Sequence, residues 1–213
     1  MPKASGDPPP QAPSGALPWS LDTDPGMGWG WGWGDHGADW ERPRPKGAAG
    51  PMSVEQQQFR HVMGHFVTGV TVITTIVEDR PVGMTAQSFV SLSLDPPMVM
   101  FCPTRNSYTW EQIEAQGMLC INVLSRAQET ISRRFAAKDD DRFAGVDWTP
   151  APVSKSPLLT GVHAWIDCEI ENVHPGGDHL IVVCRVLALA ATAESGDPLV
   201  FYLGRYGEVT QAE

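Results

Sequence analysis

Short blocks of apolar residues, separated by turn residues, recur along most of the chain, and their lengths predict strands more often than helices. Residues 69–77, GVTVITTIV, are rich in β-branched side chains, which favour a strand. A turn sequence follows at 78–81, and residues 82–94 predict a second strand that returns beside the first. The same pattern predicts further strands at 98–102, 119–123, 162–174, 179–191 and 198–203.

Three helices are predicted in addition to these strands. Residues 53–56 have the spacing of a capping box and predict a helix over 54–66 with apolar residues on one face. A short helix is predicted over 106–117, and the capping box at 125–128 predicts a third helix that ends near Ala137. Because strands dominate and hairpin-length turns join several of them, we expect a mainly β fold, an antiparallel barrel with a few peripheral helices.

The beginning of the chain differs in composition from the rest. Residues 1–50 hold 9 of the 19 prolines, 10 of the 21 glycines and 5 of the 8 tryptophans, with almost no Val, Ile or Leu. Such a segment buries too little apolar surface to offset its ordering entropy. We therefore expect a disordered tail over 1–51, one domain over 52–209 and a short C-terminal tail over 210–213. A docking role for the tryptophans and a translation start at Met52 stay open as alternatives.

The charge of the chain argues against several classes of partner. Lys and Arg number 15 against 25 Asp and Glu, the net charge is −10, and no basic run exceeds Arg133 and Arg134. Nucleic acid and anionic membrane surfaces need clustered basic residues, so we expect neither as a partner. No apolar stretch has the roughly 18 residues of a membrane-spanning helix, and the N-terminus lacks the apolar core of a secretory signal. We therefore expect a cytoplasmic protein.

Cysteine and histidine spacings do not predict a metal site. The four cysteines each lie inside an apolar run and no two have the C-x-x-C spacing, so we expect buried thiols. His61 and His65 lie four residues apart on a predicted helix and can share a metal, but no third ligand is evident nearby. No bound metal is therefore expected.

Residues 83–97, GMTAQSFVSLSLDPP, combine an apolar strand pattern with four hydroxyls and few charges. Hydroxyl and backbone N–H groups at 85–88 are suited to bind an anion such as a phosphate without carrying a formal charge. An ordinary polar edge strand explains the same pattern equally well. Two strand ends, at 102–107 and 122–125, offer similar groups, and plain helix capping is the alternative there.

Motifs for several kinds of chemistry are missing from the sequence. There is no G-x-S-x-G elbow, no H-E-x-x-H pair and no P-loop. A formal G-x-G-x-x-G at Gly32, Gly34 and Gly37 lies in a Trp-Gly repeat with no strand before it, so it does not indicate dinucleotide binding. Anion-binding segments without a nucleophile or a metal suggest that a bound cofactor carries the chemistry.

Six segments together resemble the flavin reductase-like family, which has the FMN-binding split-barrel fold. They are FVTGVTVITT (66–75), GMTAQSFVSLSLDPPMVMFCP (83–103), INVLSRAQ (121–128), RFAGVDW (142–148), GGDHLIVVCRV (176–186) and PLVFYLGRY (198–206). The resemblance covers about 59–206 in the family's order. The family includes the reductase components of two-component flavin-dependent monooxygenases, among them those of bacterial steroid and aromatic-compound degradation, which this chain resembles. The resemblance implies an antiparallel split β-barrel of the Greek-key type.

This resemblance implies an activity. In the family, a homodimer binds FMN or FAD, accepts hydride from NADH or NADPH and releases reduced flavin to a separate oxygenase. NADH is favoured here because no Arg-rich pocket marks a 2′-phosphate. Two alternatives stay open: a non-enzymatic flavin- or tetrapyrrole-binding carrier or sensor, and an enzyme that keeps its flavin and reduces an organic substrate directly. The sequence distinguishes neither FMN from FAD nor one partner oxygenase from another.

The resemblance also implies roles for individual residues. A cradle along the ribityl chain and ring edge of the flavin would comprise Thr85, Ala86, Gln87 and Ser88, with Ser91 in support. The phosphate would lie at the turn that contains Cys102, Pro103, Thr104, Arg105 and Ser107. The neighbouring wall would comprise Asn122, Val123, Ser125 and Gln128.

Further residues are implied near the nicotinamide. His179, in GlyGlyAspHis, is the one residue expected to act in catalysis, and a histidine that merely orders its hairpin is the alternative. Tyr206 falls in the family's C-terminal segment near the same cleft, together with Arg205. Gln87 departs from the family pattern, where many relatives carry Asn, but both residues offer an amide. Phe135 and Phe143 are expected to pack in the core rather than to contact the flavin.

Overall fold

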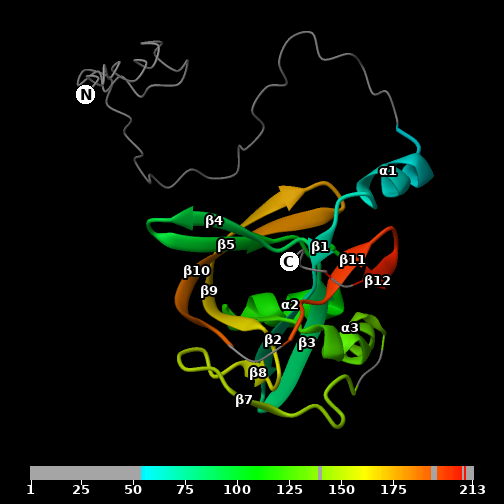
Figure 1. Ribbon diagram of the computed structural model, residues 1–213. Helices are drawn as coiled ribbons and strands as arrows, with labels where there is room; N and C mark the ends of the chain where they lie inside the picture. Colours follow the sequence, from blue (N-terminus) through cyan, green and yellow to red (C-terminus); the bar gives the residue numbers. More distant parts are fainter. Residues whose placement is uncertain (1–53, 139–140, 193–195, 208, 210–213) are drawn as a thin grey trace, which may run out of the picture. The chain divides into compact units, whose positions relative to one another are not determined.

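The computed structural model describes residues 54–138, 141–192, 196–207 and 209. Within them, seven antiparallel strands form one sheet in the order β3-β2-β6-β9-β10-β5-β4 (Figure 1). These strands are β2 (Thr71–Val77), β3 (Arg80–Ala86), β4 (Val90–Leu94), β5 (Pro97–Phe101), β6 (Met118–Val123), β9 (Ala164–Gly176) and β10 (His179–Ala191). Smaller sheets contain β1 (Thr68–Gly69), β11 (Val200–Tyr202) and β12 (Arg205–Gly207), and β7 (Trp148–Pro150) with β8 (Pro157–Leu159).

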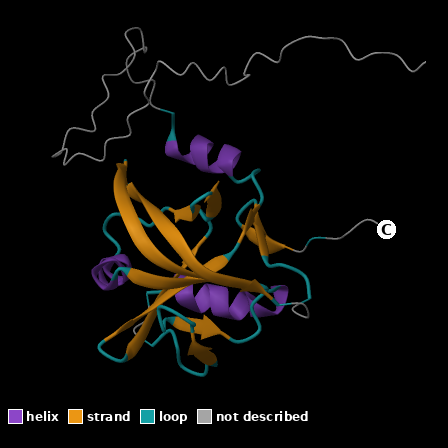
Figure 2. Ribbon diagram, turned by 90° about the vertical axis from the view of Figure 1, so that its left-hand side faces the viewer, coloured by secondary structure: helices purple, strands orange, loops and turns teal. Residues whose placement is uncertain are grey.

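Helices α2 and α3 pack along the strands (Figure 2). The described helices are α1 (Gln56–Met63), α2 (Tyr108–Gln116), the 3₁₀ turn η1 (Arg126–Gln128) and α3 (Glu129–Ala136). The predicted capping box is present, because the side-chain Oε1 of Gln128 accepts from the Ser125 N–H at 3.0 Å. The expected mainly β, antiparallel architecture with peripheral helices is confirmed.

The predicted helix over 54–66 is shorter in the structure. It spans Gln56–Met63, its N-cap residue Glu55 makes no side-chain cap, and Ser53 lies outside the described residues. None of its residues is buried, and the apolar side chains expected to face a core are at least half exposed. The apolar spacing therefore identified a helix correctly but not its partner.

The predicted single strand over 82–94 is wrong, because the chain changes partners within it. β3 pairs with β2 as far as Ala86, and β4 starts at Val90 and pairs with β5 instead. The three residues between them cross from one edge of the sheet to the other. The β2–β3 hairpin turns at Glu78 and Asp79, both with positive φ (48° and 63°), which matches the right-handed twist of the flanking strands.

One part of the core forms where helix α2 packs against strands near both edges of the seven-stranded sheet. Trp110 and Ile113 of α2 pack in one apolar cluster with Ile73 of β2 and Phe101 of β5. The rings of Phe101 and Trp110 meet edge to face with their centroids 5.6 Å apart. Helix α2 therefore packs against strands from both sides of the open sheet.

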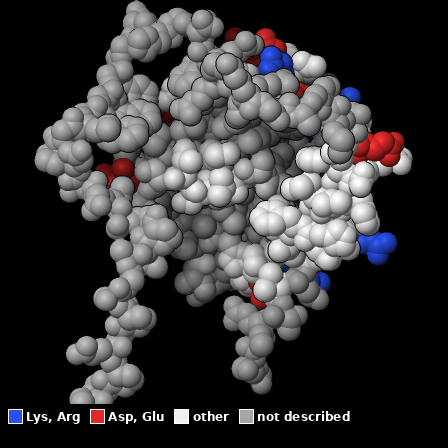
Figure 3. Space-filling view, turned by 90° about the horizontal axis from the view of Figure 1, so that it is seen from above, with Lys and Arg blue, Asp and Glu red and all other residues white. Residues whose placement is uncertain are grey.

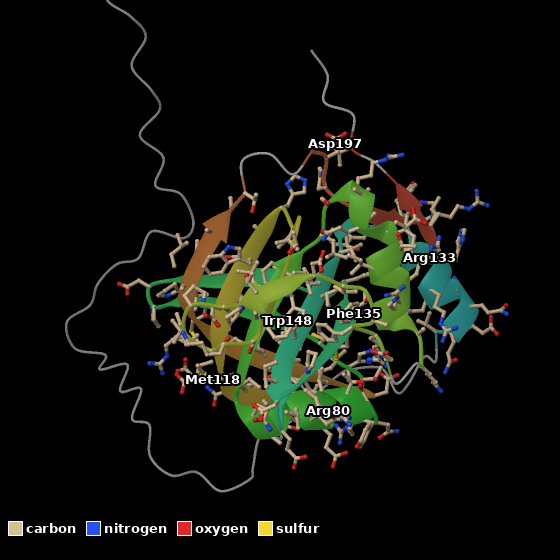
Figure 4. All side chains as sticks on the ribbon, turned by 90° about the horizontal axis from the view of Figure 1, so that it is seen from below. Arg80, Met118, Arg133, Phe135, Trp148 and Asp197 are labelled. Atoms are coloured by element: carbon tan, nitrogen blue, oxygen red, sulfur yellow. The ribbon has the colours of Figure 1, made fainter. Side chains whose placement is uncertain are left out.

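Helix α3 packs against strand β3 and contributes Phe135 to a second apolar cluster. Phe135 is buried in this cluster, whereas Arg133 of the same helix has a largely exposed side chain (Figure 4). The Phe135 ring lies against Gly83, where an added Cβ would come within 2.8 Å of Phe135 Cε1 and 2.9 Å of the Ile73 carbonyl oxygen. Glycine is therefore required at this position for close packing of the helix.

Two expectations concern membranes and metals. No helix in the described residues is long and apolar enough to cross a membrane. His61 and His65 are neighbours, with ring centroids 5.2 Å apart, but no group of three metal-binding side chains exists in the described part of the chain. The predictions for the tail at 1–51, its Trp-Gly repeat and the C-terminal residues 210–213 fall outside the described residues.

Candidate functional site

The crossing from β3 to β4 is tied to the end of β5 by one side chain. The Ser88 hydroxyl accepts from the Cys102 N–H at 2.8 Å and lies 3.2 Å from the Cys102 carbonyl oxygen, to which it can donate. Residues 85–88 and 102–107, the two segments predicted to bind an anion, therefore meet at this point. Burial raises the pKa of the Cys102 thiol, with a smaller opposing effect from the Ser88 hydrogen bond.

The turn at 102–107 is in turn bonded to the hairpin that carries His179. Thr104 and His179 form an isolated antiparallel bridge, and the Leu180 N–H donates to the Pro103 carbonyl at 2.9 Å. The Arg105 N–H donates to the Asp178 carbonyl at 3.0 Å, and its guanidinium Nη2 to the Gly177 carbonyl at 3.2 Å. The structure thus brings together the residues expected at the phosphate and at the nicotinamide.

His179 is oriented by its neighbour in the chain. Its Nδ1 lies 2.8 Å from Asp178 Oδ1, and both side chains are accessible, with relative exposures of 42% and 94%. The hydrogen bond from His179, helped by its charge, lowers the pKa of the Asp178 carboxyl. An ionised carboxylate only accepts, so Nδ1 carries the hydrogen in this contact and Nε2 is left to face other groups.

The predicted cradle contains fewer free groups than its sequence suggests. The Thr85 hydroxyl donates to the Ser132 carbonyl of α3 at 2.7 Å, and Ala86 is buried in the core. Gln87 is half-buried at the crossing, and Ser91 is exposed on β4. Together with the backbone of residues 87 and 88, the Gln87 side chain therefore offers the accessible polar groups of this segment.

The predicted wall divides into core residues and one strand end. Asn122 is fully buried, and Ser125 and Gln128 are buried in their capping box. Val123 is half-buried at the end of β6. It lies at the same level as Ala86 of β3, because Thr71 of β2 pairs with both of them. The fold therefore places the ends of β3 and β6 together but uses the polar groups of this wall internally.

A contact that the sequence did not indicate links Tyr206, through Ser132, to Thr85 of strand β3. The Tyr206 hydroxyl lies 2.8 Å from Ser132 Oγ, on the same residue whose carbonyl accepts from Thr85. The Arg133 guanidinium carbon sits 4.6 Å from the centroid of the Tyr206 ring. Beside it, Tyr206 lines a hollow of about 480 Å³ formed by the β11–β12 hairpin. Ser132 was missed because it is one of several polar residues in an amphipathic helix, and its partners are distant in sequence.

Comparison with known proteins now adds to this geometry. Residues 63–210 match the family of flavin reductase like domains. The chain belongs to this family. The resemblance inferred from the sequence is therefore confirmed.

Two relatives in this family are similar over most of their own length. The reductase subunit HsaB of a flavin-dependent monooxygenase from Rhodococcus jostii (strain RHA1) is 49% identical over 160 residues, which cover 75% of this chain and 81% of that protein. A flavin reductase from Pseudomonas putida is 42% identical over 156 residues, which cover 73% of this chain and 91% of that protein.

Two solved structures share the fold. Nitrilotriacetate monooxygenase component B from Mycobacterium thermoresistibile superposes with a TM-score of 0.71 at 46% identity, covering 74% of this chain and 91% of that one. The NADH:FAD oxidoreductase SgcE6 of Streptomyces globisporus, in complex with NAD and FAD fragments, gives a TM-score of 0.70 at 35% identity and covers 73% of this chain and 93% of that one.

Proposed function

We propose that this protein is an NAD(P)H-dependent flavin reductase that reduces FMN or FAD and supplies the reduced flavin to a separate monooxygenase. The observation that carries the proposal is the bonded junction of three segments, where Ser88 meets Cys102 and Thr104 meets His179. Membership of the family and the names of its relatives, a monooxygenase reductase subunit and a flavin reductase, support the same activity.

The residues at this junction fit a flavin nucleotide. None of the predicted cofactor-binding residues is acidic, and Arg105 adds an exposed positive charge. We assign the ring edge to Gln87 and the backbone of residues 87 and 88, and the phosphate to the side chains of Thr104, Arg105 and Ser107. Ser107 also accepts from the Trp110 N–H at 3.2 Å, so its hydroxyl hydrogen is left for a ligand. Asn122 and Gln128 act behind this surface by holding the strand and helix ends in place.

In hydride transfer from a nicotinamide to a flavin, the protein positions the two rings, and no side chain has to break a bond. A bound flavin supplies the hydride acceptor and a dihydronicotinamide the hydride donor. His179 stands at the edge of the junction, and its Nε2 makes no hydrogen bond with the residues that the structure describes. It can therefore hold the carboxamide of the nicotinamide or exchange a proton with solvent. Substitutions here should therefore change binding more than the rate at saturation.

We also propose a homodimer, based on apolar surface. Val90, Leu92 and Leu94 of β4 are 48%, 48% and 91% exposed, and Phe59 of α1 is 58% exposed. Uncharged residues cover much of the described surface in the view from above (Figure 3). Large exposed apolar patches mark interaction surfaces. Light scattering should therefore give twice the mass of one chain, and Leu94→Lys should shift the measured mass toward that of the monomer.

The cytosolic location expected from the sequence stays a prediction.

The activity is tested by oxidation of NADH with and without added FMN or FAD, in wild type and His179→Ala. His61→Ala, on α1 and outside the junction, is the matched control. Turnover that requires free flavin, with a several-fold higher KM for NADH and an unchanged flavin Kd in His179→Ala, is the expected result. Flavin binding without any turnover in the wild type would instead favour a carrier or sensor.

A further inference from the structure

A cavity of about 700 Å³ lies along the free edge of β3, on the side of α2. Strand β3 forms one wall, the first turns of α2 form the other, and the segment that follows the undescribed residues 139–140 covers one end. The volume is in the range of small-molecule sites. None of the residues assigned above to the flavin lines this cavity. Its lining comprises Arg80, Pro81, Val82, Gly83, Tyr108, Thr109, Gln112, Asp141, Arg142 and Phe143.

The cavity carries positive charge on an acidic protein. Two guanidinium groups line it against one carboxylate, that of Asp141, whereas the whole chain has a net charge of −10. Arg142 is held in place because its Nη1 donates to the Gly83 carbonyl at 2.7 Å and to the Thr109 hydroxyl at 2.9 Å. Arg80 makes no salt bridge with any residue that the structure describes, and it lies beside α2 (Figure 4). The site is therefore suited to an anionic group.

Aromatic and hydroxyl groups accompany these charges. The Tyr108 side chain is 75% exposed at the start of α2, and the Phe143 ring lies in the same lining. Exposed tyrosine rings in a concave surface offer a face on which a nucleobase can stack. Thr109 and Gln112 add neutral hydrogen-bonding groups that can contact a ribose or a base edge.

The position of the cavity relates it to the flavin site. Tyr108 directly follows the turn at 102–107, to which we assign the flavin phosphate, and Gly83 lies two residues before Thr85 on the same strand. A flavin mononucleotide ends at its phosphate, whereas a dinucleotide continues into an adenosine phosphate. From this arrangement we infer that the β3–α2 cavity binds the adenosine phosphate half of a dinucleotide substrate, with Tyr108 under the adenine and Arg80 at a phosphate. The inference rests on the proposed function.

Both FAD and NADH contain this chemical group. Each of them carries adenosine joined to a pyrophosphate. The residues that line the cavity therefore recognise the adenosine phosphate that FAD and NADH have in common. The two sources differ in which measured constant responds. If the adenylate is that of FAD, substitutions in the cavity raise the Kd for FAD and leave the Kd for FMN unchanged. If it belongs to NADH, the KM for NADH rises with either flavin and both flavin Kd values stay unchanged.

The test compares wild type with Tyr108→Ala and Arg80→Gln, and uses Tyr202→Ala as the matched control for loss of an exposed tyrosine. Kd values for FMN and FAD are measured by quenching of flavin fluorescence, and KM for NADH is measured with each flavin. We expect about a tenfold rise in the FAD Kd for Tyr108→Ala, from loss of one stacking contact, with the FMN Kd unchanged. A rise of similar size confined to the KM for NADH also supports the adenylate site and assigns it to NADH.

Other outcomes overturn the inference. Equal weakening of FMN and FAD in the variants would place Tyr108 and Arg80 at the part that both flavins share. Values for all three ligands that match the wild type and Tyr202→Ala would leave the cavity without a nucleotide role. In either case the wild type still binds flavin, so the proposed reductase activity stands. Failure of the wild type to bind either flavin would instead remove the proposed function itself.

Discussion

Asn122 offers a direct test of which polar residues serve the fold and which serve the ligand. Its side-chain Nδ2 lies 3.2 Å from the Val72 carbonyl, the Thr74 hydroxyl and the Pro157 carbonyl. Its Oδ1 accepts from the Leu159 N–H at 2.8 Å. The amide therefore joins strands β2, β6 and β8, and no part of it is exposed. We expect Asn122→Ala to destabilise the protein without changing its intrinsic affinity for flavin.

The expected size follows from these contacts. Leaving one buried N–H without an acceptor costs about 1–3 kcal/mol, and loss of the amide donor adds about 0.5–1.5 kcal/mol. We therefore expect Asn122→Ala to lower the free energy of unfolding by about 2–4 kcal/mol. In a domain of about 150 residues this lowers Tm by about 5–15 °C. Asn172→Ala, at a half-buried position on β9, is the control and should cost less than about 1 kcal/mol.

Two measurements decide the matter. Thermal unfolding gives the change in stability, and flavin titration well below the Tm of the variant gives Kd for the folded protein. The expected result is a lower Tm with a Kd within about twofold of wild type, which is less than 0.5 kcal/mol. An unchanged Tm with a tenfold higher Kd would show that Asn122 contacts the flavin, as the family resemblance suggested, and would refute the structural role.

Further predictions concern packing, titration and one hydrogen bond. Gly83→Ala should lower the free energy of unfolding in urea by about 1–3 kcal/mol because the methyl group has no room, whereas at Gly69 nothing lies within 4 Å of an added Cβ and Ala should cost far less. Burial raises the pKa of the Cys120 and Cys184 thiols to about 12. The unfolded chain then loses thiol protons from about pH 9 while the folded chain keeps them, so each thiol lowers stability by about 1.4 kcal/mol per pH unit between pH 9 and 12. Cys184→Ala should make this alkaline loss shallower in urea titrations at several pH values, and an unchanged slope would contradict the burial argument. Tyr206→Phe should cost about 0.5–1.5 kcal/mol in the same assay, since it removes only the hydroxyl contact at 2.8 Å.

Local structure was predictable where the signal is local. The β2–β3 hairpin follows from a run of β-branched residues and a two-residue turn, and the helix start at Ser125 follows from residues three apart. The crossing between β3 and β4 was not predictable in this way. Its residues continue the apolar pattern of a strand, and the hydrogen bond that holds the crossing is donated to Ser88 by the N–H of Cys102, 14 residues away. A periodic pattern carries no information about a change of pairing partner.

The candidate site was predictable as a set of segments but not as a set of contacts. The sequence and the resemblance together selected 85–88, 102–107 and His179, and the structure brings these segments together. Whether a polar side chain faces a ligand or the core depends on residues from other strands. The Asn122 side chain, for example, is bonded to a residue 37 positions away, which no local pattern indicates.

The edge strand β3 connects the stability of this fold with its proposed binding sites. An edge strand exposes unpaired backbone groups, and proteins cover such edges to prevent unwanted pairing. Here Arg142 bonds to the Gly83 carbonyl of β3 and to Thr109 of α2, while Ser88 attaches the end of the strand to β5. The residues that cover the edge are the same ones that line the proposed adenylate cavity and the flavin cradle. A substitution such as Arg142→Ala therefore alters stability and binding together, so only a Kd measured on folded protein separates the two effects.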